Sequence, residues 1–93
     1  MSKIPIDMEK VDKESVKREI LRAAIIAELD AVNLYEQMAA LTKDEDLKKL
    51  LLDIAKEEKT HVGEFQTMLL KIDPEQEREL KEGRKEFDGL IER

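Results

Sequence analysis

Two glutamates and one histidine interrupt regularly spaced apolar residues in this 93-residue sequence. Glu28 stands in one apolar stripe, and Glu58 and His61 stand together in another. A buried carboxylate without a partner is unfavourable, so such groups are normally paired with another charge or bound to a metal ion. Carboxylate oxygens and an imidazole nitrogen suit iron, manganese or zinc, and the absence of cysteine disfavours softer metals. The sequence therefore predicts a metal site formed by Glu28, Glu58 and His61.

The elements that must position these residues are predicted to be helices. Apolar residues recur at alternating intervals of three and four, which is a heptad pattern, and no stretch alternates as a strand would. The chain is therefore expected to be all-α, an antiparallel two-helix hairpin followed by a short C-terminal helix. The expected helices cover about residues 13–41, 43–72 and 74–90. Residues 1–11 are expected to be a flexible N-terminal segment, followed by one domain over residues 12–93.

Polar residues at the expected helix ends can cap the backbone. Asp12 can cap the first helix. Thr42 with Glu45 three residues later has the capping-box pattern, so we expect Thr42 to start the second helix. The segment Asp73-Pro74-Glu75-Gln76 marks the third start, because proline suits the first helical position and the glutamine can reach back to the aspartate.

In such a hairpin the three candidate ligands fall at one height. At a rise of ~1.5 Å per residue, Glu28 and Glu58 lie ~21 Å and ~24 Å from the turn near Thr42. Glu58 and His61 are three residues apart, so their side chains face the same way on adjacent turns. The three groups are therefore expected to converge midway along the hairpin.

One chain carries half of a known kind of two-metal site. Ferritin-like di-metal proteins use a Glu from each of two helices and Glu-x-x-His from each of the other two. This chain has one helix of each kind, so a two-fold dimer forming a four-helix bundle would complete the set. Its four carboxylates would balance two divalent cations. An empty site would crowd the carboxylates and weaken the dimer.

The apolar faces of the two long helices are wider than a single hairpin needs. We expect a second chain to cover the surplus. The alternative is that the third helix covers it, although it offers few apolar residues. These are Leu80, Phe87, Leu90 and Ile91.

The candidate residues also have purely structural interpretations. Glu58 and His61 can form an ordinary ion pair, and Glu28 can be paired with His61 inside one chain. Tyr35, two turns beyond Glu28, either packs in the core or hydrogen-bonds a ligand. Gly63 next to the site indicates a close helix approach. The other glutamates of the region are predicted to lie on solvated faces: Glu36, Glu57 and Glu64.

Composition excludes several classes of function. The chain has 17 Lys and Arg against 23 Asp and Glu, a net charge of -6, so nucleic acid is not an expected partner. The longest apolar run, residues 23–27, is far shorter than the ~20 residues of a membrane helix, so no membrane association is expected. With no cysteine, disulfides and thiol catalysis are excluded.

The segments at residues 27–37 and 57–61, AELDAVNLYEQ and EEKTH, resemble the encapsulated ferritin family. The archaeal, encapsulin-associated domains also share Asp73-Pro74-Glu75-Gln76, and the resemblance covers roughly residues 20–82. It implies a ferroxidase centre between two chains, a ring-shaped decamer, and iron mineral held by an encapsulin shell in the cytoplasm. By position, Glu28, Glu58 and His61 match the iron ligands and Tyr35 a neighbouring aromatic.

The sequence departs from this family at two places. Some members have an acidic residue where Ala27 stands, in a cluster that collects metal at the entrance, of which Asp30 matches another member. Residues 87–93 match a shell-docking tail only vaguely, so the tail is divergent or the chain is a domain of a shell fusion. Two rivals to a ferroxidase stay open. They are a rubrerythrin-like di-metal peroxidase, whose complete form usually adds a cysteine-bound iron, and a non-catalytic helical oligomerisation module.

Overall fold

The computed structural model describes residues 13–92, which form three helices and no strand. Helix α1 covers Lys13–Leu41, α2 covers Glu45–Ile72 and α3 covers Pro74–Ile91. The expected all-α class is confirmed. The expected cap Asp12 and the segment 1–11 lie outside the described residues. None of the described helices is both long enough and apolar enough to cross a membrane.

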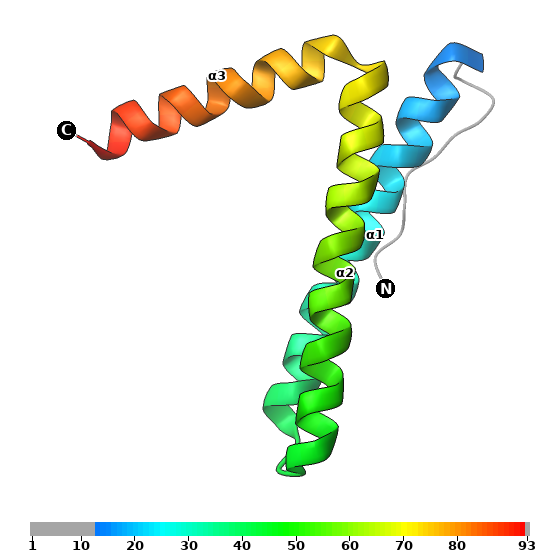
Figure 1. The fold of residues 1–93 in the computed structure, drawn as a ribbon, viewed down its shortest axis with the longest axis vertical. Coiled ribbons are helices and arrows are strands. Elements are labelled where there is room, and N and C mark those ends of the chain that lie inside the picture. The colour runs from blue at the N-terminus through cyan, green and yellow to red at the C-terminus, as the bar shows by residue number, and fades with distance from the viewer. Residues whose placement is uncertain (1–12, 93) are drawn as a thin grey trace.

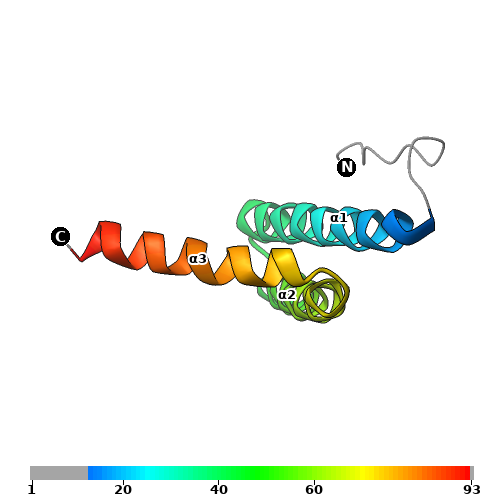
Figure 2. The same cartoon turned by 90° about the horizontal axis from the view of Figure 1, so that it is seen from above.

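Helices α1 and α2 form an antiparallel hairpin, and α3 turns away from it (Figures 1 and 2). The principal extents are 46 × 45 × 19 Å, so the structure is thin in one direction. Only a few side chains among the described residues are buried, and all of them belong to α1 or α2. The buried apolar residues are Leu21, Ala23, Val32, Ala39, Leu51, Ala55 and Leu69.

The turn between α1 and α2 differs from expectation. Asp44, not Thr42, caps α2, because the Asp44 carboxylate accepts the backbone N–H groups of Asp46 and Leu47, each at 3.0 Å. The Thr42 N–H donates to Met38 O at the end of α1, at 3.3 Å, and the Thr42 hydroxyl accepts from the Asp44 N–H, at 3.1 Å, and not from an N–H inside α2. The prediction that α2 starts at residue 43 with a Thr42 cap is therefore wrong by two residues.

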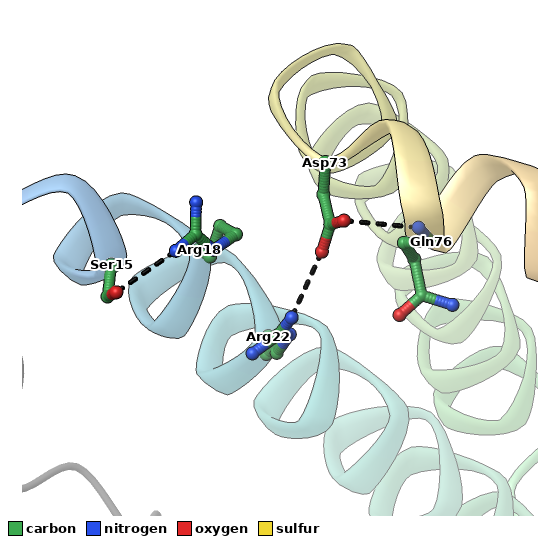
Figure 3. A network of polar contacts seen from close by, with 5 residues as sticks. All are labelled: Ser15, Arg18, Arg22, Asp73 and Gln76. Carbon is green, nitrogen blue, oxygen red and sulfur yellow. Dashed lines mark hydrogen bonds and ion pairs between the residues drawn. The ribbon is translucent and has the colours of Figure 1, made fainter.

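The Asp73 carboxylate makes two polar contacts at the corner between α2 and α3 (Figure 3). Asp73 Oδ1 accepts the Gln76 N–H at 3.1 Å, which confirms the expected cap of α3, and Asp73 Oδ2 accepts from Arg22 of α1 at 3.0 Å. The Asp73 N–H donates to Leu69 O, so within residues 13–92 the expected return bond from the Gln76 side chain is not made. One carboxylate therefore joins all three helices.

Helix α3 does not cover the hairpin. Among the described residues it packs only on α2, near the corner, and buries none of its side chains. The alternative in which the third helix covers the surplus apolar surface is therefore wrong. Apolar side chains therefore stay exposed on both long helices. The large ones are Ile20, Ile26, Leu29, Leu34, Met38 and Leu41 of α1 and Leu47, Leu50, Leu52 and Met68 of α2.

Gly63 does not mark a close approach within the chain. A Cβ placed on Gly63 would meet no atom of the structure within 4 Å, beyond its own helix backbone and chain neighbours. The close helix approach predicted from Gly63 is therefore not made by another helix within residues 13–92, and an approach by a second chain stays a prediction. The exposed position of Gly63 explains why: the facing helix α1 packs along another side of α2.

Candidate metal centre

The hairpin brings the three candidate ligands together. Glu28 comes from α1, and Glu58 and His61 come from successive turns of α2. One ligand atom of each residue lies within 4.8 Å of those of the other two. This is the convergence midway along the hairpin that residue counting predicts, because the antiparallel helices place equal distances from the turn side by side.

His61 Nδ1 lies between the two carboxylates. It is 3.4 Å from Glu28 Oε2 and 3.5 Å from Glu58 Oε2. The two glutamate side chains are each 20% exposed, while the His61 side chain is 44% exposed. The carboxylates therefore lie inside the hairpin and the imidazole lies at its edge.

The Glu28 carboxylate has an oxygen that a cation would satisfy and that the surrounding residues do not. Its Oε2 atom is buried and has no hydrogen-bond partner among the described residues. A buried acceptor without a donor is costly, and the contact to His61 is longer than an ordinary hydrogen bond. Two donors that share a first-row divalent ion at about 2.1 Å lie about 3.0–3.5 Å apart, so both contacts of His61 have the right separation. The purely intrachain pairing of Glu28 with His61 leaves this oxygen unsatisfied.

The group consists of three donors, and the described part of the chain adds no further donor to it. Across residues 13–92, this is the only cluster of three or more potential ligands. Asp30, half-buried on α1, does not extend it, and neither does Ala27. Any further ligand of an ion held here would come from outside this cluster.

A pocket of about 230 Å³ opens beside the ligands. Its lining includes Glu28, His61, Glu64 and Phe65. Glu64 is exposed, as predicted, but it also faces this pocket, so its assignment to an ordinary solvated surface was incomplete. The available signal was its spacing of three residues from His61, which places both on one side of α2.

Tyr35 and Glu36 do not take part in the group. Tyr35 is half-buried and makes no hydrogen bond to a described residue, so the expected bond to a ligand is not made within one chain. Glu36 pairs with Lys59 across the hairpin at 3.1 Å, with both side chains largely exposed. Tyr35 therefore acts as a packing residue in the single chain.

Known proteins are similar to this chain in sequence and in fold. The rubrerythrin family model matches residues 19–90. The chain is 58% identical over 85 residues to the ferritin-like-encapsulin shell fusion protein of Pyrococcus furiosus, covering 91% of this chain and 25% of that protein. It is 40% identical over 62 residues to the encapsulin nanocompartment cargo protein EncC of Myxococcus xanthus, covering 67% and 48%. The chain thus spans about a quarter and about half of these curated relatives.

A solved structure agrees over nearly the whole chain. The crystal structure of the encapsulated ferritin domain from Pyrococcus furiosus superimposes with a TM-score of 0.84 at 49% identity, covering 98% of both chains. Both the sequence and the structural similarity span α1, α2 and α3, including the segments that carry Glu28, Glu58 and His61.

Proposed function

Because this chain belongs to the encapsulated ferritins, within the rubrerythrin family, we propose that it is a ferroxidase whose di-iron site is shared between two copies. The observation that carries the proposal is the ligand group itself. Glu28, Glu58 and His61 bring three donor atoms within 4.8 Å of one another, and one of these residues has a buried oxygen without a partner. A cation is the simplest partner for such an oxygen.

The second copy supplies what the single chain lacks. Two chains related by a two-fold axis combine two Glu helices with two Glu-x-x-His helices, the full set of a ferritin-like di-metal site. Pairing also covers apolar side chains that the single chain exposes, such as Leu34 and Met38 at 45% and 39%. Hydrophobic burial and metal binding therefore favour the same dimer.

Iron is the substrate, and each of the three residues has its own role in binding it. Glu28, Glu58 and His61 of each chain would together hold the two Fe(II) ions, with Glu58 the candidate for the ligand shared between them. Each Fe(II) gives one electron to dioxygen, which takes up two electrons and two protons to reach the peroxide level, and two Fe(III) ions leave for mineralisation. The protein contributes geometry, charge balance and an open coordination position.

The names of two relatives support association with a shell. One relative is named as a fusion to an encapsulin shell and the other as an encapsulin cargo protein. We propose that this chain also works inside an encapsulin compartment, as a ring-shaped decamer built from such dimers, and that the shell holds the iron mineral.

Anaerobic loading with Fe(II), followed by air, tests the ferroxidase proposal. We expect two iron ions per dimer, a doubling of mass on pairing, and rapid growth of ferric absorbance. Glu58→Ala should lose rapid oxidation, whereas Glu57→Ala, its exposed neighbour, should oxidise iron as the wild type does. Unchanged oxidation kinetics in Glu58→Ala would refute the site.

A peroxidase is the second candidate, because the matching family is that of rubrerythrin. It would oxidise the same two ions with hydrogen peroxide in preference to dioxygen. Comparing the two oxidants at equal concentration distinguishes the candidates. A dimer that forms without metal and binds no iron would instead favour a non-catalytic oligomerisation module.

A further inference from the structure

The pocket beside the metal ligands contains one acidic residue that belongs to no ligand group. Glu64 lines it together with Glu28, His61 and Phe65. It lies three residues beyond His61 on α2, but its carboxylate is not within the 4.8 Å group formed by Glu28, Glu58 and His61. The exposed Glu64 carboxylate therefore lines the same pocket as Glu28, whose side chain is 20% exposed, and His61, whose side chain is 44% exposed.

The charge of Glu64 is not neutralised by the chain. Among residues 13–92, it makes no ion pair and no hydrogen bond. Some exposed glutamates elsewhere in the fold are paired, such as Glu36 with Lys59 at 3.1 Å and Glu77 with Lys81 at 3.7 Å. Among the described residues Glu57 is unpaired like Glu64, but it does not line this pocket. A free carboxylate attracts a divalent cation more strongly than a paired one does.

The surroundings of Glu64 strengthen that attraction. The aromatic ring of Phe65 forms part of the same pocket wall, and an apolar wall lowers the local dielectric and focuses the field of a charge. A cation in this pocket is therefore close to the exposed Glu64 and to two of the candidate ligands, Glu28 and His61.

We propose that Glu64 is an additional iron-binding residue, which holds Fe(II) in this pocket before the ion passes to Glu28 and His61. This inference rests on the proposed ferroxidase function. Glu64 is exposed, unlike Glu28 and Glu58, so it exchanges its ion readily with solvent and with the inner ligands. Its role is transfer, so it changes how much Fe(II) is needed and not how many ions the finished site holds.

Glu64→Gln in the full chain tests this role, with Glu57→Gln as the matched control. Glu57 is also an exposed glutamate of α2, but it does not line the pocket. The Glu64 variant should need roughly three- to tenfold more Fe(II) for half-maximal oxidation, with the maximal rate and the iron bound per dimer unchanged. Glu64→Asp, which keeps the charge, should recover most of this loss, and Glu57→Gln should match the wild type.

Binding of Mn(II) without dioxygen gives a readout independent of oxidation. The Glu64→Gln variant should take up Mn(II) more slowly than the wild type, with the same final number of ions. Equal Fe(II) dependence in both variants would overturn the proposal, and so would loss of bound ions in Glu64→Gln, since that would make Glu64 a permanent ligand. If the wild type neither binds nor oxidises iron, the ferroxidase proposal itself fails.

Discussion

Replacing Glu28 by glutamine should stabilise the metal-free protein while abolishing its stabilisation by metal. Carboxylate oxygens 4.8 Å apart, the outer limit for the Glu28 and Glu58 ligand atoms, repel by about 3 kcal/mol at an effective dielectric constant of about 20. The imidazole of His61 lies beside both, and each glutamate is 20% exposed, so solvent and His61 offset part of this repulsion. We expect a net gain of about 1 kcal/mol, which raises the melting temperature by about 4–8 °C in a domain of this size.

The metal-loaded protein should show the opposite effect. A metal present at 100 times its dissociation constant stabilises the state that binds it by about 2.7 kcal/mol. This corresponds to about 10–20 °C in the melting temperature of the wild type. The Glu28→Gln variant has lost a charged oxygen donor at the site, so most of this increment should disappear.

Thermal unfolding followed by circular dichroism, at one protein concentration and with and without Co(II), measures both effects. Co(II) accepts the same oxygen and nitrogen donors and avoids the oxidation of Fe(II) in air. Glu57→Gln, on an exposed face of α2, is the control and should behave as the wild type in both conditions. A Glu28→Gln variant that melts lower without metal, yet keeps the full Co(II) increment, would refute the reasoning.

Three further perturbations test the fold and the pairing. Asp44→Ala should cost about 1 kcal/mol of the free energy of unfolding measured in urea, because Asp44 caps α2. Thr42→Ala should cost less than half of that, and equal losses in the two variants would contradict the assignment of the cap. Asp73→Ala should cost about 1–2 kcal/mol in the same assay, since it removes the α3 cap and the half-exposed contact to Arg22; a loss no larger than that of Arg22→Ala would contradict a capping role. Leu34→Glu places a charge on the open apolar surface, so native mass measurement should find single chains with unchanged helicity; intact dimers would place the interface elsewhere.

The sequence alone was sufficient to predict the three helices and the meeting of Glu28, Glu58 and His61. A helix has a fixed rise and period, so counting residues from a turn places side chains at a height and on a face. An error of two residues in the start of α2 shifts the predicted height by only ~3 Å. The prediction that the three ligands meet therefore holds, although Asp44 and not Thr42 caps α2.

Only the tertiary structure decided what depends on contacts between distant residues. At the corner where α3 begins, Asp73 contacts Arg22 of α1. These two residues lie 51 positions apart in the sequence, so no local pattern specifies their contact. From the sequence, Glu64 is one of several glutamates predicted to be exposed. Only the packing of α1 against α2 places Glu28 in the pocket that Glu64 lines. Likewise, the choice of which apolar stripe is buried depends on how α1 and α2 pack, because periodicity gives the spacing of a stripe but not its partner.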